Sequence, residues 1–163
     1  MKSVILIRHA KSSWDDIGLS DFDRPLNERG KEDAPKMAKR LLAKDITIDA
    51  FISSPAKRAK KTASLFAEEF GSRKDEIILV PELYLAGPEI FYSAIAQAPA
   101  KAKCIAVFSH NPGITDFVNG LTNTRIDDMP TCSVFGVKAN IKQWSQFKDA
   151  VKEFWFFDYP KLK

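Results

Sequence analysis

Short apolar runs alternate with longer amphipathic stretches along the chain. Residues 3–8 are nearly all apolar and rich in strand-forming side chains, which is typical of a strand covered on both faces in the centre of an α/β sheet. Five later runs predict further strands at 50–53, 77–80, 104–109, 132–137 and 151–157. The rhythm of these runs predicts a sheet whose strands are connected mostly by helices.

Four segments between the strands place apolar residues at helical spacing. The first helix is expected over residues 28–44, with Leu42 in its buried stripe and with Pro35 tolerated only in the first turn. The other three helices follow Ser54-Pro55, Gly87-Pro88 and Asn111-Pro112. Ser54 and Asn111 are each expected to cap the helix that follows. The proline after each of them is expected to begin that helix.

The order of these elements predicts a single domain over residues 1–163 with an α/β fold. We expect a three-layer α/β/α sandwich with a mostly parallel, mixed central sheet. Between the first strand and the first helix, residues 11–27 are polar and include Gly18, Pro25 and several aspartates. A loop of this length in a compact domain often serves a functional site.

Composition narrows the function classes. The chain has 25 basic and 21 acidic residues, and its net charge of +4 favours anionic substrates but is too small and dispersed to predict nucleic-acid binding. The basic run at 57–61 also lacks the interleaved aromatic residues of a single-strand binder. Cys104 and Cys132 lie far apart without metal-ligand spacing, so we expect two buried thiols in a reducing compartment, no metal and no cofactor.

The distribution of apolar residues also bears on location. No apolar run approaches the ~20 residues that span a bilayer. The first run leads directly into Arg8 and lacks the longer hydrophobic region and the cleavage site of a signal peptide. We therefore expect a cytoplasmic protein without a membrane partner.

Cations stand at three junctions where a predicted strand ends. The residues are Arg8 and His9 after the first strand, Arg58 after the second and His110 after the fourth. In open α/β sheets, ligand sites form beyond the carboxyl ends of the strands, so these residues are expected to meet and bind a dianion. Arginine forks and helix N-termini suit phosphate better than carboxylate. Histidine is the available nucleophile, since neither cysteine lies at such a junction and there is no Walker-type glycine loop or carboxylate cluster for Mg²⁺.

Five blocks of sequence carry a resemblance to a known family. They are Leu6-Ile7-Arg8-His9-Ala10, Asp23-Arg24-Pro25-Leu26-Asn27-Glu28-Arg29-Gly30, the run from Ser53 to Ala63, Pro81-Glu82-Leu83 and Ser109-His110-Asn111-Pro112-Gly113. In this order they resemble the histidine phosphatase superfamily, the phosphoglycerate-mutase-like enzymes. The Arg-His-Ala-Lys-Ser sequence at positions 8–12 and the short length are most similar to the SixA-like phosphohistidine phosphatase branch.

The resemblance implies a role for each matching cation. His9 would attack the phosphorus and hold a transient phosphohistidine, which water then hydrolyses without a metal. Arg8, Arg58 and His110 would bind the phosphoryl oxygens. As a nucleophile His9 must be neutral, whereas His110 is most useful as a cation.

Three other positions have open roles at the level of sequence. Glu82 follows a strand as the acid of the family's first branch does, which makes it the candidate acid/base, with an exposed non-catalytic carboxylate as the alternative. Arg24 orients the loop, contacts substrate or makes a surface ion pair of little energetic value. Ala10 replaces the family's usual glycine, which raises the question of how closely phosphate can approach the backbone there.

The leading interpretation is a metal-independent phosphatase that acts on phosphohistidine in a protein, such as a phosphotransfer domain or a phosphotransferase-system component. One alternative is a phosphatase for a small phosphoester, which uses the same pocket and depends more on Glu82. The other is a regulatory domain that binds phosphate without turnover. The modest insertions between the sheet elements favour an open site that a macromolecular substrate can reach.

Overall fold

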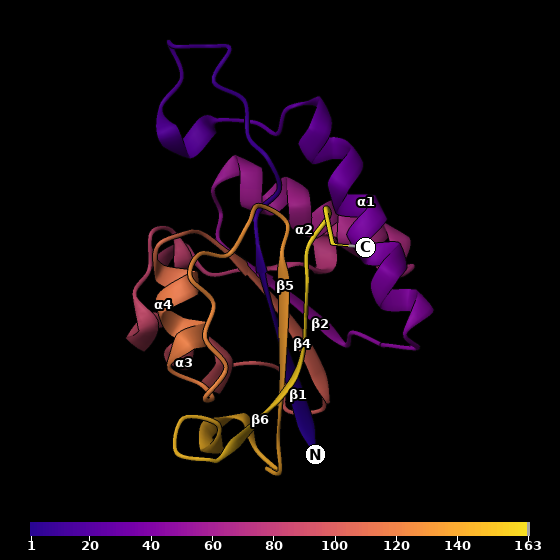
Figure 1. Cartoon of the computed structure of the whole chain (residues 1–163), viewed down its shortest axis with the longest axis vertical. Coiled ribbons are helices and arrows are strands. Elements are labelled where there is room, and N and C mark those ends of the chain that lie inside the picture. Colours follow the sequence, from indigo (N-terminus) through magenta and orange to yellow (C-terminus); the bar gives the residue numbers. More distant parts are fainter. Residues whose placement is uncertain (163) are drawn as a thin grey trace.

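A computed structural model describes residues 1–162 and shows a six-stranded sheet between two layers of helices (Figure 1). The strands are β1 (Lys2–Arg8), β2 (Ala50–Ser53), β3 (Ile78–Leu79), β4 (Cys104–Ser109), β5 (Val134–Ala139) and β6 (Lys152–Asp158). They lie in the order β3-β2-β4-β1-β5-β6, in which the first three pairings are parallel and the last two antiparallel. The predicted α/β fold with a mostly parallel, mixed sheet is confirmed.

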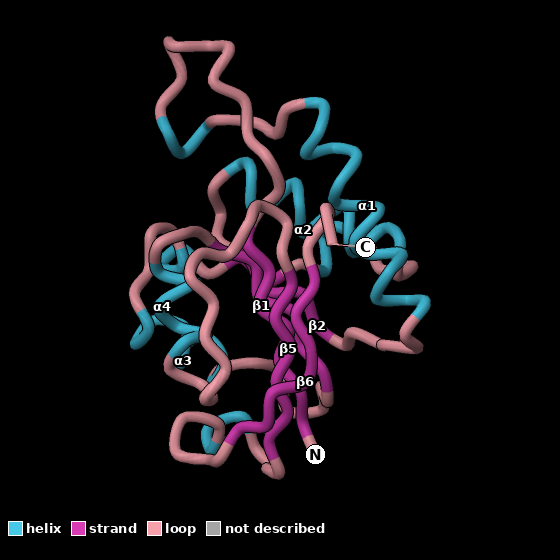
Figure 2. Tube along the Cα trace, viewed as in Figure 1, coloured by secondary structure: helices cyan, strands magenta, loops and turns pink. Residues whose placement is uncertain are grey.

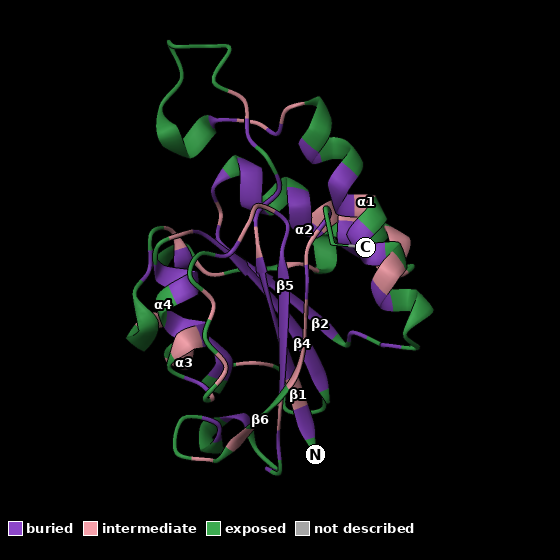
Figure 3. Ribbon diagram, in the orientation of Figure 1, coloured by how far each residue is buried: buried purple, intermediate pink, exposed green. Residues whose placement is uncertain are grey.

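The two faces of the sheet are covered by different helix pairs. Helices α1 (Glu28–Ala43) and α2 (Lys57–Glu69) lie on one face, and α3 (Pro88–Ala96) and α4 (Gly113–Asn119) lie on the other. Alternate side chains of β1 supply both cores. Val4 and Leu6 pack with α3 and α4, whereas Ile5 and Ile7 pack with α1 and α2. The continuous apolar run of β1 is therefore buried on both sides (Figure 3).

Helix α1 differs from expectation at two positions. Pro35 lies well inside the helix and not in its first turn. A proline there loses one backbone hydrogen bond, but the buried face that includes Met37 and Leu41 still packs against the sheet, and this packing outweighs the loss. Leu42 is 38% exposed, so it lies beside the buried stripe and not in it.

Helix α2 begins later than predicted. Its first residue is Lys57, and Ala56 at the N-cap has no side chain to accept a capping bond. Ser54 was expected to cap the helix. Its Oγ instead accepts the Ala56 backbone N–H at 3.2 Å and lies 2.8 Å from Nε2 of His110. The hydroxyl therefore links the end of β2 to the end of β4.

Helix α4 also lacks the predicted cap. It begins at Gly113, and Pro112 occupies the N-cap position. The Asn111 side chain turns instead to the segment before β5, where its Nδ2 donates to Oδ1 of Asp128 at 2.7 Å and to the carbonyl oxygen of Met129 at 3.1 Å. Asn111 thus holds a distant segment beside the end of β4.

The remaining strands end close to their predicted bounds. β3 is shorter than expected, because Pro81 and the 3₁₀ turn that it begins follow directly after this edge strand. β5 starts two residues later than predicted, since Cys132 has a positive φ of 61° and belongs to the preceding turn. Within residues 1–162, no helix has the length and apolar character to cross a bilayer.

The segment 11–27 leaves the sheet and returns to it as an extended loop. Figure 2 shows this loop projecting beyond the end of the sheet where β1 finishes. An isolated antiparallel bridge between Ser12 and Leu26 closes its base, and a single 3₁₀ turn, Asp21–Asp23, interrupts it. The predicted long loop is confirmed, and its position places the turn near the carboxyl ends of the parallel strands.

The start of α4 depends on close backbone contact at Gly113. A Cβ atom at this position would overlap the carbonyl oxygen of Ala86, so we expect Gly113→Ala to lower the free energy of unfolding by about 2 kcal/mol. Gly120→Ala is the matched control, because a Cβ there meets its nearest atom at 3.5 Å. Urea unfolding followed by circular dichroism compares the two variants. Equal urea midpoints would show that the close contact at Gly113 does not contribute to the free energy of unfolding.

Candidate active site

The ends of three parallel strands bring the sequence-predicted cations together. His9 follows β1, Arg58 lies in the first turn of α2 after β2, and His110 follows β4. Because β2, β4 and β1 are neighbouring parallel strands, these positions lie together at the carboxyl ends of the strands. The ring centres of His9 and His110 are 5.1 Å apart, and Nε of Arg58 lies 3.3 Å from Nε2 of His9. All three side chains are buried.

The His9 ring is held in one neutral tautomer. Its Nδ1 lies 2.7 Å from the carbonyl oxygen of Ala10, which can only accept a hydrogen bond, so the ring proton is on Nδ1. Nε2 then carries a lone pair and accepts the Nε–H of Arg58. Burial is the main cause that lowers the pKa of His9 to about 3, and the charges of Arg58, Arg8 and Arg24 contribute to the same shift. His9 is therefore neutral at physiological pH with Nε2 available as a nucleophile.

His110 is also neutral. Its Nε2 lies 2.8 Å from Oγ of Ser54, and burial together with His9 and Arg58 lowers its pKa to about 3. Burial and the neighbouring positive charge outweigh the attraction of Asp21, so the cationic form of His110 stays a prediction for the site with a phosphoryl group bound. An anion placed against the ring would favour the protonated form.

Arg8 is fixed by the segment that precedes β5. Its Nη1 donates to the carbonyl oxygen of Met129 at 2.7 Å. Its Nε and the Nδ1 of His110 are buried and have no hydrogen-bond partner among the described residues. Buried polar groups are normally paired, so these two nitrogens are candidates for the atoms that a bound phosphoryl group satisfies.

Asp21 supplies an anion to the site that the sequence did not single out. Its carbonyl oxygen accepts from Nη1 of Arg58 at 2.6 Å, and its carboxylate accepts from Nη2 at 2.9 Å. The Tyr84 hydroxyl donates to the same carboxylate at 2.6 Å, and this bond together with Arg58 lowers the pKa of Asp21 to about 2. The Asp21 oxygens thus occupy guanidinium donors that a phosphoryl group would use.

Tyr84 forms part of the wall next to His110. Its ring stands edge-on to the His110 ring with 5.5 Å between centres and contacts Phe22 of the loop in the same way at 5.1 Å. Neither Tyr84 nor Asp21 has a local sequence signal, because each acts through partners that are distant along the chain. Their roles follow from the tertiary structure alone.

Arg24 organises the loop from within. Its Nη2 donates to Oγ of Ser12 at 2.6 Å, its Nε donates to the carbonyl oxygen of Ser13 at 3.0 Å, and its guanidinium carbon lies 3.3 Å from the centre of the Trp14 ring. Arg24 is only 7% exposed and also contacts Asp21 at 3.3 Å. The surface ion-pair alternative does not describe such a buried residue, whereas the alternative in which Arg24 orients the loop does.

Glu82 lies apart from this network. It is exposed in the 3₁₀ turn Pro81–Leu83 after β3, beside a hollow that Ile52 and Ile90 also line. Within the described residues its carboxylate makes no hydrogen bond or ion pair, and thus none to His9 or His110. Its acid/base role stays a prediction.

Ala10 directs its methyl group into the core. The residue is fully buried and packs in the same cluster as Ile7. Its backbone N–H donates to Oγ1 of Thr62 at 3.0 Å, and the Thr62 hydroxyl donates to the carbonyl oxygen of Arg58 at 2.8 Å. The methyl group that replaces the usual glycine hydrogen is therefore packed in the core.

The cysteines take no part in the site. Cys104 and Cys132 are free and buried, and burial raises the pKa of both thiols. In the part of the chain that the structure describes, no three His, Cys, Asp or Glu side chains gather in an arrangement that could hold a metal ion.

Comparison with known proteins finds one family and several relatives. The family model of the histidine phosphatase superfamily (branch 1) matches residues 4–84. An uncharacterised chloroplastic protein of Arabidopsis thaliana is 29% identical over an alignment of 153 positions that covers 89% of this chain and 70% of that protein. Phosphoserine phosphatase 1 of Hydrogenobacter thermophilus is 40% identical over 70 residues, 42% of this chain and 32% of that protein. The chain thus spans about a third of the length of the second relative.

A solved structure of the protein histidine phosphatase SixA complexed with tungstate has a similar fold. Its TM-score is 0.81 at 20% identity, and the match covers 97% of each chain. At this identity the likeness establishes the fold: the two chains share the arrangement of sheet and helices over nearly their whole length.

The contact between Asp21 and Arg58 predicts competition with bound anions. Asp21→Asn keeps the shape of the side chain but removes its charge, so we expect inorganic phosphate to bind about two- to fivefold more tightly. Isothermal titration calorimetry measures the change. Asp23→Asn is the matched control, because the Asp23 carboxylate accepts from Ser20 and does not contact Arg58. Equal affinities in the two variants would rule out the competition.

Proposed function

Because the chain belongs to the histidine phosphatase superfamily and is thereby a phosphatase, we propose that it hydrolyses phosphohistidine on a protein through a phosphoryl group carried by His9. One observation supports this proposal above the others. The His9 ring is neutral, its proton is held on Nδ1 by the Ala10 carbonyl, and its Nε2 lone pair faces the Arg58 guanidinium. A nucleophile and a phosphate-binding cation are thus already in contact.

The proposed reaction has two displacement steps. In the first, Nε2 of His9 forms a bond to phosphorus while the bond from phosphorus to the substrate nitrogen breaks and its electron pair leaves with that nitrogen. In the second, water attacks phospho-His9, the Nε2–phosphorus bond breaks with its electron pair returning to Nε2, and inorganic phosphate leaves while the protons of the water pass to phosphate and solvent. Arg58, Arg8 and His110 supply the donors that stabilise the negative charge on the phosphoryl oxygens in both steps.

The surroundings of His9 favour a phosphohistidine leaving group. An imidazole that carries a proton on its second nitrogen departs as a neutral molecule and needs no acid from the enzyme. An alkoxide departing from a phosphoester does need one. Asp21 is held ionised, and Glu82 has no hydrogen bond in the described structure that links it to His9. The site therefore has a better-placed nucleophile than general acid.

The second candidate is a phosphatase for a small phosphoester. It is favoured by the relative named phosphoserine phosphatase 1, although this chain spans only 32% of that protein. The same His9 and cation cluster would serve it, and Glu82 would have to move toward the leaving group. For either substrate we propose no nucleic-acid partner, and the two free, buried thiols suit a reducing compartment such as the cytoplasm.

Trapping the intermediate tests the proposal. In the presence of EDTA, mixing the protein with a phosphotransfer domain that has been phosphorylated on histidine with phosphoramidate should add one acid-labile phosphoryl group to His9. Rapid quench at alkaline pH and mass spectrometry locate the group. His9→Ala should abolish turnover, because Nε2 is lost. Arg58→Ala should keep the nucleophile and raise KM about tenfold or more, because a charge-assisted contact is removed.

These variants also exclude the non-catalytic alternative. A fully active His9→Ala variant would sink the covalent mechanism. A wild-type protein that binds phosphate but shows no phosphoryl transfer to His9 would leave only the regulatory anion-binding domain.

Glu82→Gln ranks the two substrate classes. The change removes the proton that a general acid donates but keeps the size of the side chain. We expect kcat for phosphohistidine hydrolysis to stay within about twofold, and kcat for a phosphoester such as phosphoserine to fall by about tenfold or more if Glu82 is the acid. Steady-state release of phosphate measures both. An equal loss of kcat on both substrates would contradict the proposal that the phosphohistidine leaving group needs no acid from the enzyme.

A further inference from the structure

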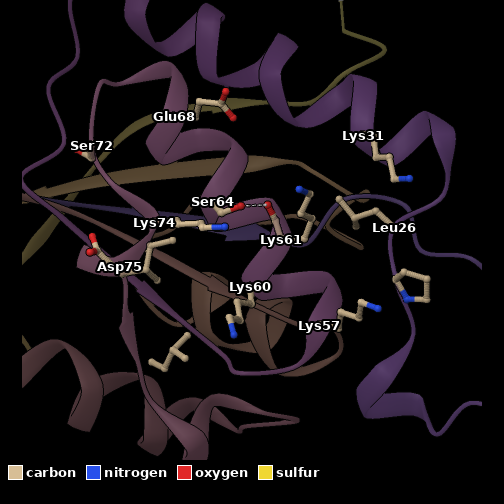
Figure 4. A pocket seen from close by; sticks show the side chains of 13 residues that line it. Leu26, Lys31, Lys57, Lys60, Lys61, Ser64, Glu68, Ser72, Lys74 and Asp75 are labelled. Carbon is tan, nitrogen blue, oxygen red and sulfur yellow. Dashed lines mark hydrogen bonds between the residues drawn. The ribbon is translucent and has the colours of Figure 1, made fainter.

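A basic groove of about 1040 Å³ runs along the outer face of α2 (Figure 4). Its lining includes five lysines: Lys31, Lys57, Lys60, Lys61 and Lys74. All five are exposed, and in the described structure only Lys31 has an ion-pair partner, Glu28 at 3.6 Å. The groove is therefore bordered by cations whose charge is largely uncompensated.

The groove also offers apolar contact. Leu26, Ile77 and Leu79 line it, and Leu79 is 40% exposed. Two carboxylates, Glu68 and Asp75, border it as well. Asp75 is already paired with Arg73 at 2.6 Å, which reduces the negative charge that it presents. An occupant that combines negative charge with apolar side chains matches this surface better than a purely ionic one.

The groove adjoins the site through α2 itself. Lys57 immediately precedes Arg58 in the first turn, and Lys57, Lys60, Lys61 and Ser64 follow the spacing of one helix face. The opposite face of α2, which includes Arg58 and Thr62, is buried. From Lys57 to Glu68 the helix rises roughly 16 Å. A ligand lying in the groove therefore extends well beyond a single phosphoryl group bound at His9.

We propose that this groove is the docking surface for an acidic, amphipathic helix of the phosphohistidine-bearing protein substrate. The inference rests on the proposed function and names the kind of partner that the same site serves. Acidic side chains of that helix pair with the lysines, and its apolar side chains contact Ile77 and Leu79. Docking there holds the phosphohistidine of the partner at the edge of the sheet where His9 lies.

The lining argues against a nucleic acid as the occupant. Among the described lining residues no aromatic side chain is available to stack a base, and the carboxylates of Glu68 and Asp75 would face a phosphate backbone. An acidic protein helix avoids this repulsion by placing its apolar residues opposite those positions. The charge pattern therefore selects a protein.

Charge reversal in the groove tests the proposal. In the Lys60→Glu/Lys61→Glu variant we expect kcat/KM on a phosphotransfer domain phosphorylated on histidine, chosen for an acidic helix beside that histidine, to fall about tenfold or more, mainly through KM. Turnover of free phosphohistidine should stay within about twofold, because neither lysine contacts His9 or Arg58. Added salt should weaken wild-type activity on the protein substrate and have less effect on the variant.

A matched control carries the same charge change elsewhere. Lys101→Glu/Lys103→Glu alters two exposed lysines just before the amino end of β4, whereas His110 follows the carboxyl end of this strand. This variant should behave as wild type on both substrates, which separates docking from net charge. Equal losses in the two double variants would overturn the docking proposal.

The other outcomes are distinguishable. If the wild type hydrolyses the phosphoprotein and Lys60→Glu/Lys61→Glu is unimpaired, the groove is not the docking surface and the proposed function stands. If the wild type hydrolyses free phosphohistidine or phosphoserine but no phosphoprotein, the protein-substrate function fails first. If the variant loses affinity only for a fluorescent single-stranded oligonucleotide, the occupant is a nucleic acid and the proposal is overturned.

Discussion

The hydrogen bond from Nδ1 of His9 to the carbonyl oxygen of Ala10 fixes the chemistry of the site. It works only because Ala10 is itself immobilised, with its methyl group in the core and its N–H on Thr62. The Thr62 hydroxyl in turn donates to the carbonyl oxygen of Arg58. The interior packing of two layers therefore determines which nitrogen of His9 carries the proton. The same contacts set the Arg58 side chain opposite Nε2, the ring nitrogen that carries no proton.

The second constraint is an excess of positive charge in a buried place. Arg8, Arg24 and Arg58 all depress the pKa of His9, and Asp21 is the carboxylate that contacts two of them. Desolvation keeps both histidines uncharged, which prevents two further cations from adding to the repulsion. An incoming dianion meets fixed guanidinium groups and competes with the Asp21 carboxylate and carbonyl oxygen for Arg58. The arrangement thus selects doubly charged ligands over neutral ones.

Much of this architecture can be predicted from the sequence because its signals are local. The apolar run of β1 predicts burial on both faces. Ligand sites form beyond the carboxyl ends of strands, which predicts that His9, Arg58 and His110 lie close together. What could not be predicted depends on tertiary contacts. Ser54 and Asn111 are residue types that often cap helices, yet neither occupies an N-cap position, and their side chains also bond to His110 and Asp128. The sequence shows that a polar side chain needs a hydrogen-bond partner. Only the tertiary structure decides which partner it finds.

The position of Pro35 and the role of Asp21 could not be predicted for the same reason, since both depend on tertiary contacts. Pro35 is costly in an isolated helix, but α1 is stabilised by its buried face, so the local penalty is outweighed. Asp21 is one of several aspartates in a polar loop, and its partner Arg58 is 37 residues away. No spacing rule reaches across that distance.

Helix α2 joins these two levels, since one face holds Arg58 and Thr62 in the core while the other presents lysines to solvent. The periodicity of its sequence reveals both faces at once, because positions three and four apart share a side of the helix. The same helix also carries Arg58, whose Nε lies 3.3 Å from Nε2 of His9. A partner that contacts the outer face therefore lies against the same helix that holds Arg58 next to the nucleophile.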